Sequence, residues 1–154
     1  MIAVKKAGPE SIPTIQELAQ VTWAVAYASI ITPQQMSYML DLFYSNNSLQ
    51  EQMQKDHQFI IAWEAGTAVG FASYSPKSDE EPFVYRLHKI YIDPGQQGKG
   101  IGKHLLDFII ADIHTAAATK LELNVNRFNK ALGFYKKSGF VILREEDIDI
   151  GNGY

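Results

Sequence analysis

The sequence contains no cysteine among its 154 residues. Disulfides, thiolate metal sites and a cysteine nucleophile are therefore excluded. It also lacks an apolar run of the roughly 18 residues that a membrane-spanning helix needs, and its first residues lack the apolar core of a signal peptide. Positive charge is not in excess, because 14 Lys and Arg against 17 Asp and Glu give a formal net charge of −3. These absences predict a soluble cytoplasmic protein with no nucleic-acid or membrane partner.

The composition that remains is typical of a globular protein. Hydrophobic residues make up 46% of the chain and charged residues 20%, which argues against disorder. No internal repeat or linker divides the sequence, so we expect a single domain over residues 1–154. The polar, proline-bounded run from Ser75 to Pro82 is expected to connect two strands.

Hydrophobic periodicity and turn signals predict an α/β protein with a mixed sheet. Thr32 and Ser48 each begin a capping-box pattern and are expected to start helices, while Gly139 is expected to end one. The expected strands cover residues 2–6, 59–64, 68–74, 83–92, 121–125 and 140–143. The expected helices cover residues 12–26, 33–44, a short stretch after 48, 101–113 and 129–138.

The most informative segment is a glycine-rich turn that follows a predicted strand and opens an amphipathic helix. Gly98, Gly100 and Gly102 remove side chains where backbone N–H groups converge at the helix N-terminus. Such a terminus binds anions, and a pyrophosphate group would suit it. The plainer interpretation is a tight turn that lets the helix pack closely on the sheet. The nearby Lys99 and Lys103 favour the phosphate-binding interpretation.

Two common nucleotide motifs do not fit this turn. A Walker loop requires lysine after its second glycine, but Ile101 follows Gly100. A Rossmann turn that starts at Gly98 would require glycine at the position that Lys103 occupies. An ATP- or NAD-binding domain is therefore disfavoured.

A different pattern does fit. Residues 97–102 read Gln-Gly-Lys-Gly-Ile-Gly, and residues 129–140 read Asn-Lys-Ala-Leu-Gly-Phe-Tyr-Lys-Lys-Ser-Gly-Phe. With these two motifs in order, the chain resembles the GNAT superfamily of acyl-CoA-dependent N-acyltransferases, most closely from Tyr85 to Phe140. The resemblance implies a three-layer α/β/α fold whose central mixed, mostly antiparallel β-sheet is splayed at the acyl-CoA site. It also implies acetyl-CoA as the acyl donor, without a metal.

The resemblance assigns the donor site mainly to backbone groups. Those of Ile90, Tyr91 and Ile92 would pair with the pantetheine arm, and Asn129 would contact the donor or cap its own helix. The pyrophosphate would be held by the main chain of Gln97, Gly98, Lys99, Gly100, Ile101, Gly102 and Lys103.

The resemblance also suggests the catalytic groups. Tyr135 would protonate the departing thiolate, although it could instead be a packed aromatic residue. Many family members place a glutamate on the strand before the glycine turn, and the matching position here is Arg86, which cannot act as a base. His88, two residues further along and on the same strand face, is the candidate base, unless it is structural. Glu122 or an ordered water is the alternative.

The acceptor side is less well defined by the sequence. The resemblance implies acetyl transfer to a primary amine, such as a small amine or a polyamine, by direct attack in a ternary complex. The alternative is a catalytically silent acyl-CoA-binding regulatory module. Family members usually add a strand after the one expected at 140–143, and only residues 144–154 remain here. Either the chain is truncated, or a partner supplies the missing strand, or this member does without it; an open sheet edge would favour oligomerisation, for example as a homodimer. Aromatic residues at helical spacing would form core or line an acceptor pocket, namely Trp23, Tyr27, Tyr38, Phe43 and Tyr44.

Overall fold

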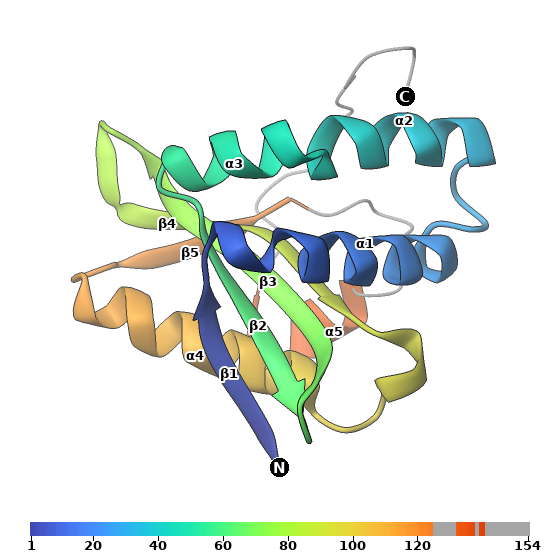
Figure 1. Cartoon of the computed structure of the whole chain (residues 1–154). Helices are drawn as coiled ribbons and strands as arrows, with labels where there is room; N and C mark the ends of the chain where they lie inside the picture. Colours follow the sequence, from blue (N-terminus) through green and yellow to red (C-terminus); the bar gives the residue numbers. More distant parts are fainter. Residues whose placement is uncertain (125–131, 138, 141–154) are drawn as a thin grey trace.

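A computed structural model describes residues 1–124, 132–137, 139 and 140 of the chain (Figure 1). Two short 3₁₀ helices, Pro9–Ser11 and Pro94–Gln96, accompany the main elements. In chain order the main elements are β1 (Ile2–Ala7), α1 (Ile12–Ala26), α2 (Pro33–Tyr44), α3 (Asn46–Gln54), β2 (Gln58–Glu64), β3 (Thr67–Ser78), β4 (Glu81–Ile92), α4 (Ile101–Thr115), β5 (Lys120–Leu123) and α5 (Leu132–Lys137).

The described strands form one sheet in the order β1-β2-β3-β4-β5. Strands β1 to β4 pair antiparallel, and β5 joins β4 in parallel. Helices α1, α2 and α3 cover one face, and α4 covers the other (Figure 1). Each face has its own apolar core, with Ile15 and Phe71 in the first and Ile60 and Leu105 in the second. The predicted three-layer α/β/α fold with a mixed, mostly antiparallel sheet is confirmed.

One of the two predicted capping boxes is present. The Gln35 N–H donates to Thr32 Oγ1 (3.1 Å) and the Thr32 N–H donates to Gln35 Oε1 (2.8 Å), so Thr32 caps α2 as expected. The prediction for Ser48 is wrong, because Ser45 caps α3 and its Oγ accepts the Ser48 N–H at 3.2 Å. Ser45 has extended backbone angles, whereas Ser48 lies inside the helix.

The strands around the first and second hairpins are partly as predicted. Ala65 and Gly66 both have positive φ, 49° and 80°, which is typical of a tight type I′ turn between β2 and β3. The prediction that residues 75–82 form a connection is wrong, because β3 and β4 pair through most of this stretch. A register irregularity between Pro76 and Ser78 accommodates the proline, which has no N–H to donate.

Several predictions concern residues that lie outside the described part of the chain. These are the first turn of the helix expected at 129–138 and the strand expected at 140–143; the extent of the domain over 1–154 also stays a prediction. Within the described part, Gly139 ends α5 as expected, with φ of 100° and its N–H donated to the Lys136 carbonyl. No helix in the described ranges is both long enough and apolar enough to cross a membrane.

Candidate active site

The sheet opens between β4 and β5. Their parallel pairing runs from Val84 opposite Lys120 to Leu87 opposite Leu123, where β5 ends. Strand β4 continues to Ile92 and pairs with β3 on its other side, so residues 88–92 have no β5 partner among the described residues. The backbone groups of Ile90 to Ile92 that face β5 are thereby left for another partner, as expected of a splayed sheet.

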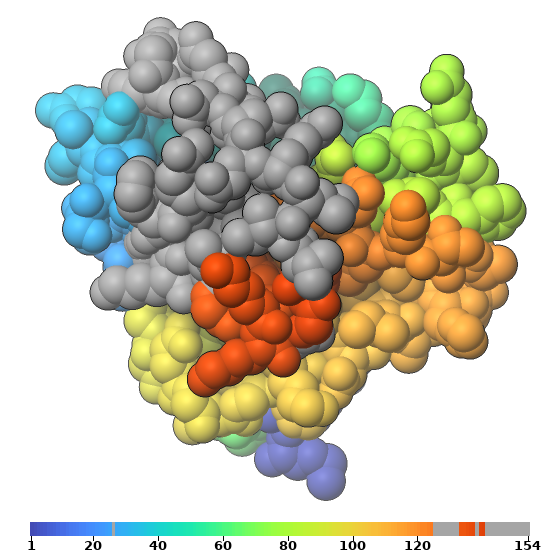
Figure 2. Space-filling view, turned by 180° about the vertical axis from the view of Figure 1, so that it is seen from behind, coloured from blue at the N-terminus to red at the C-terminus, as the bar shows by residue number. Residues whose placement is uncertain are grey.

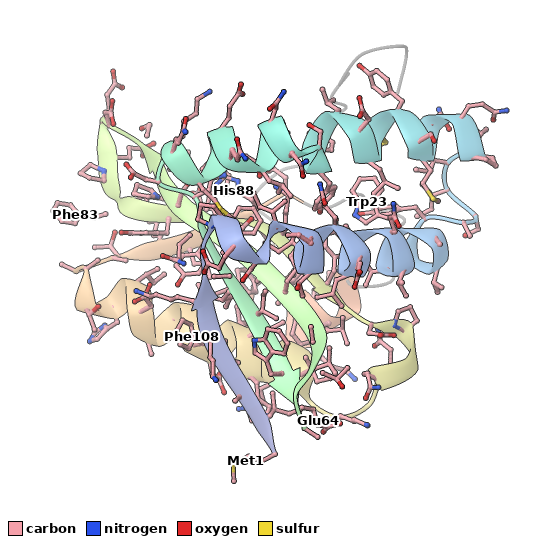
Figure 3. All side chains as sticks on the ribbon, in the orientation of Figure 1. Met1, Trp23, Glu64, Phe83, His88 and Phe108 are labelled. Carbon is pink, nitrogen blue, oxygen red and sulfur yellow. The ribbon has the colours of Figure 1, made fainter. Side chains whose placement is uncertain are left out.

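A β-bulge at His88 determines which face each side chain of β4 occupies. Ser73 pairs with Lys89 while Tyr74 pairs with Leu87, so His88 is the extra residue. Leu87, Ile90 and Ile92 consequently belong to the core against α4, whereas Tyr91 belongs to the core against α1 and α2. His88 and Trp23 lie on this second side of the sheet (Figure 3).

The glycine turn follows β4 directly. Gly98 and Gly100 have φ of 84° and 72°, a left-handed conformation that glycine adopts most easily, and α4 begins at Ile101. A Cβ built on either residue would meet no atom of the described residues within 4 Å, so both face open space in that part of the chain. Gly102 differs, because its Cβ would lie 3.1 Å from both Ile92 Cδ1 and Phe134 Cζ. Two glycines therefore leave room for a ligand, and the third serves close packing.

The two lysines of the turn have carboxylate partners in the described structure. Lys99 Nζ lies 3.1 Å from Glu64 Oε1 and 2.7 Å from Gln96 Oε1. Lys103 Nζ lies 2.8 Å from Asp107 Oδ2. Because both lysines are exposed, an anion at the turn would compete with these carboxylates for them.

Tyr135 lies on α5, where its neighbour Phe134 is 3.1 Å from the position that a Cβ on Gly102 would occupy. Figure 2 shows α5 in contact with the yellow segment that contains the turn and the start of α4. Tyr135 is 8% exposed and packs against Phe134 and Phe140, with ring centroids 5.5 and 5.9 Å away. Burial, with a smaller effect of the nearby Tyr27, raises the pKa of Tyr135. Its phenol therefore remains protonated at neutral pH. Asn129 lies outside the described residues.

His88 is hydrogen-bonded and stacked. Its Nε2 lies 2.7 Å from Ser75 Oγ, and its ring is parallel to that of His57 with centroids 4.2 Å apart. Burial, followed by the charges of His57, Lys89 and Arg86, lowers the pKa of His88 to about 3. The imidazole is therefore neutral at physiological pH and is a weak proton acceptor.

The alternative base, Glu122, is already engaged. Its Oε1 lies 3.0 Å from Lys77 Nζ and 3.8 Å from Arg86 Nη2. The hydrogen bond from Lys77, with the nearby positive charges, lowers the pKa of this carboxyl. Glu122 is thus held as an ion-paired carboxylate.

Sequence reasoning missed two side chains on β4. The Tyr91 hydroxyl lies 3.0 Å from that of Tyr27, although only the backbone of Tyr91 was singled out. Lys89 Nζ donates to Gln52 Oε1 at 2.6 Å and lies 5.5 Å from the ring centres of Tyr44 and Phe59. The bulge at His88 turns Lys89 toward the face of the sheet that α1, α2 and α3 cover. A strict alternation of side chains along β4, counted from Leu87, would have placed Lys89 on the opposite face.

The aromatic residues of α1 and α2 divide between core and site. Trp23 and Tyr44 are each 4% exposed and are core residues. Tyr27 and Phe43 are half-buried. Tyr27 alone of these four makes a described hydrogen bond to β4. Tyr38, the fifth aromatic residue of the predicted set, also has an interaction partner.

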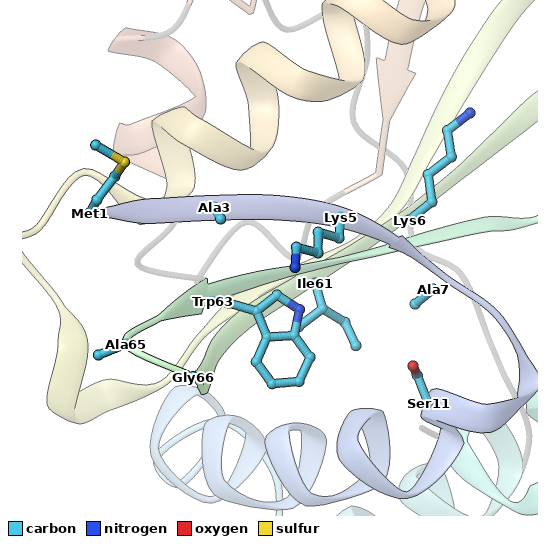
Figure 4. Close-up of a pocket in the computed structure, with 10 residues that line it drawn as sticks. All are labelled: Met1, Ala3, Lys5, Lys6, Ala7, Ser11, Ile61, Trp63, Ala65 and Gly66. Atoms are coloured by element: carbon cyan, nitrogen blue, oxygen red, sulfur yellow. The ribbon is translucent and has the colours of Figure 1, made fainter.

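A separate cavity of about 490 Å³ opens at the β1 edge of the sheet (Figure 4). Lys5, Ile61 and Trp63 lie in its wall. None of its lining residues belongs to β4, to the glycine turn or to α5, so it is distinct from the candidate site. In the described ranges no group of three or more His, Asp or Glu side chains could hold a metal ion.

Comparison with known proteins agrees with this geometry. Residues 27–151 match the family described as the acetyltransferase (GNAT) domain. The solved PaiA N-acetyltransferase of Thermoplasma acidophilum, a complex with coenzyme A, superposes with a TM-score of 0.85 and 26% identity, covering 97% of this chain and 94% of that one. The chain belongs to the GNAT acetyltransferase family, as the two motifs predicted.

Curated relatives differ in how much they share with this chain. The spermidine N(1)-acetyltransferase of Thermoplasma acidophilum is 27% identical over 96% of this chain and 91% of its own length. The N-alpha-acetyltransferase RimI of Mycobacterium tuberculosis is 34% identical, but the match covers 54% of this chain and 52% of RimI. The chain therefore spans only about half of that relative.

Proposed function

We propose that this protein is an N-acetyltransferase that moves an acetyl group from acetyl-CoA to a primary amine by direct attack in a ternary complex. The observation that carries the proposal is the open glycine turn before α4, next to the end of β4 that β5 leaves unpaired. The likeness to an acetyltransferase complexed with coenzyme A supports the same donor. The absence of cysteine supports direct attack rather than a cysteine-bound acyl relay.

The donor would be held mainly by main-chain groups. Those of Ile90 to Ile92 would pair with the pantetheine amides, and N–H groups from Gln97 to Lys103 would face the pyrophosphate. The open space beside Gly98 and Gly100 fits a phosphate group. Asn129 remains a predicted contact. When bound, acetyl-CoA supplies an activated acetyl thioester with a thiolate leaving group.

Tyr135 would act as the acid for that leaving group. Its buried phenol retains its proton at neutral pH, which a proton donor requires. We expect Tyr135→Phe to lower kcat by about a hundredfold while the Kd for acetyl-CoA changes less than about twofold. Tyr85→Phe, a half-buried tyrosine on β4, is the matched control. Unchanged turnover in Tyr135→Phe would remove Tyr135 from the mechanism.

Proton removal from the amine is assigned to His88 or to water. His88 is neutral, as a base must be, but its pKa of about 3 makes it a weak one. A fall in kcat of about tenfold or more in His88→Gln would support His88 as the base. A fall of less than about threefold would assign the step to water.

The acceptor is proposed to be a small amine or a polyamine. The near full-length likeness to a spermidine N(1)-acetyltransferase supports a polyamine. Thiol release from acetyl-CoA should be compared with spermidine, free lysine and an alanyl tripeptide as acceptors. Faster turnover of the tripeptide than of spermidine would contradict the polyamine assignment.

A catalytically silent acyl-CoA-binding module is the second candidate. Arg86 occupies the position where the resemblance places a glutamate, and the neighbouring His88 is a weak base. Binding of acetyl-CoA without thiol release across the three amines would favour this candidate over the enzyme.

Calorimetric titration with acetyl-CoA is the first test. We expect binding near 1:1, with no binding of ATP or NAD under the same conditions. Absence of acetyl-CoA binding would overturn both candidates. A cytoplasmic location and a homodimer are part of the proposal, and light scattering on the purified chain tests the latter.

A further inference from the structure

Two tyrosine hydroxyls join the C-terminal end of α1 to the part of β4 that has no β5 partner among the described residues. The Tyr27 and Tyr91 oxygens lie 3.0 Å apart, although the residues are 64 positions apart in the sequence. Tyr27 is the C-cap residue that follows α1, and Tyr91 precedes the last residue of β4. Both side chains are half-buried. The contact therefore connects the helical layer with the strand beside the proposed donor site.

Aromatic packing holds the two rings in place. The Trp23 ring lies 4.7 Å from Tyr27 and 6.1 Å from Tyr91, and the Phe71 ring lies 5.7 Å from Tyr91. Removal of either hydroxyl would leave this packing intact. The effect of the hydroxyls can therefore be measured separately from that of the rings.

The same contact anchors the loop between α1 and α2. The Tyr27 carbonyl accepts the N–H groups of Ile30 (3.0 Å) and Ile31 (3.1 Å), so the loop folds around this residue. Because the Tyr27 hydroxyl is hydrogen-bonded to that of Tyr91, the loop between α1 and α2 is held against β4. If this loop forms one wall of an acceptor site, the position of that wall depends on the hydroxyl pair.

The hydroxyl pair lies on the face of the sheet opposite to the start of α4. Tyr91 packs with the α1 and α2 core, whereas Ile90, Ile92 and the start of α4 lie on the opposite face. The donor would enter from the glycine turn, and an amine must reach the same reacting carbonyl from another direction.

We propose that the Tyr27–Tyr91 hydroxyl pair positions the amine acceptor, by fixing the α1–α2 loop against the open end of β4. This proposal rests on the proposed acetyltransferase function. Tyr27 and Tyr91 are positioning residues here, and they carry no proton to or from the reacting atoms. Loss of either hydroxyl should loosen the acceptor side and leave the donor side unchanged.

The test uses Tyr27→Phe, Tyr91→Phe and the double variant, with Tyr85→Phe as the control. Spermidine is the acceptor, and thiol release gives KM and kcat. Each single variant should raise KM for spermidine about three- to tenfold, as expected for the loss of one hydrogen bond, with kcat changed less than about twofold. The double variant should be no worse than either single variant, because both remove the same interaction.

Two readouts that do not depend on turnover accompany the kinetics. Calorimetry should give the same Kd for acetyl-CoA in all variants, within about twofold, because Tyr91→Phe keeps the main-chain groups that are proposed to hold the donor. The thermal midpoints of the two single variants and the double variant should fall by a similar amount, roughly 2–4 °C. Tyr85→Phe should leave KM for spermidine unchanged.

The outcomes separate the two proposals. A lowered thermal midpoint with an unchanged KM for spermidine would make the pair purely structural. Additive increases in KM in the double variant would show that the two hydroxyls do not act together. Either result overturns the positioning role while the acetyltransferase stands. A wild-type chain that binds no acetyl-CoA, or that acetylates none of the amines, would overturn the acetyltransferase and the positioning role with it.

Discussion

Lys89 is a largely buried amine with no carboxylate within ion-pair distance among the described residues. Its partners are the Gln52 amide oxygen and the rings of Tyr44 and Phe59. These groups do not replace the solvation that the ammonium loses, and burial lowers the pKa of Lys89 to about 8. The charge therefore destabilises the folded chain at neutral pH.

This destabilisation should appear in the pH dependence of folding. Between about pH 8 and pH 10.4 the unfolded chain holds a proton on Lys89 that the folded chain has released, so the free energy of unfolding rises with pH, by roughly 3 kcal/mol at most. Lys89→Met should abolish the rise in urea unfolding measured from pH 7 to pH 10. Exposed Lys5 provides the control, and Lys5→Met should follow the wild type. A wild-type slope that persists in Lys89→Met would show that another group causes it.

At the level of single residues, the sequence indicated which residues are candidates for the site better than it indicated their burial and pKa. The choice of Tyr135 followed from a motif, whereas its buried environment includes the rings of Phe134 and Phe140. His88 was chosen for its usual pKa, near neutrality. In the folded chain its pKa is lowered by burial and by the stacked His57, which the segment between α3 and β2 supplies. Such long-range contacts leave no local signal.

At the level of elements, the glycines of the turn and of the first hairpin offer a matched comparison. Gly100 and Gly66 both have left-handed φ, 72° and 80°, and among the residues that the structure describes a Cβ on either meets no atom within 4 Å. Alanine at either position should therefore destabilise the chain by a similar amount, about 1 kcal/mol. Only Gly100 lies where the donor phosphates are proposed to bind.

Gly100→Ala should raise the Kd for acetyl-CoA about tenfold or more, because its methyl group would enter the space that a phosphate needs. Gly66→Ala should leave that Kd unchanged while losing the same stability, measured by calorimetry and urea unfolding. Equal Kd values for both variants would show that the turn does not contact the donor.

Element boundaries were predictable where a few adjacent residues determine them. Thr32 and Gln35 form a complete capping box, and the Ala65-Gly66 turn is flanked by clear strands. Ser48 misled because it is followed by Glu51 three residues later, while Ser45 caps the helix with its hydroxyl alone. Strand β3 extends through Pro76 to Ser78 and β4 begins already at Glu81, because the two strands pair with each other and this tertiary pairing overrides the local turn signals.

At the level of the whole molecule, the stacked imidazoles of His57 and His88 join two distant parts of the sheet region. His57 precedes β2, and His88 is the bulge residue of β4. Burial and the charges of Lys89 and Lys55 lower the pKa of His57, and burial lowers that of His88 to about 3. Neither ring is charged in the folded chain at neutral pH, and protonation of both would bring two like charges into contact.

Acid should therefore unfold this protein through the imidazole pair. Below about pH 6.5 the unfolded chain takes up protons that the folded chain does not, so the free energy of unfolding falls as the pH drops, by up to about 3 kcal/mol at pH 4 from His88 alone. In urea unfolding from pH 7 to pH 4, the double variant His57→Gln/His88→Gln should show a flatter dependence than the wild type. His104→Gln, an exposed histidine on α4, should follow the wild type. If the free energy of unfolding depends on pH in the same way in the double variant and the wild type, the histidine pair does not cause the acid sensitivity. Protonation of carboxylates would then account for it.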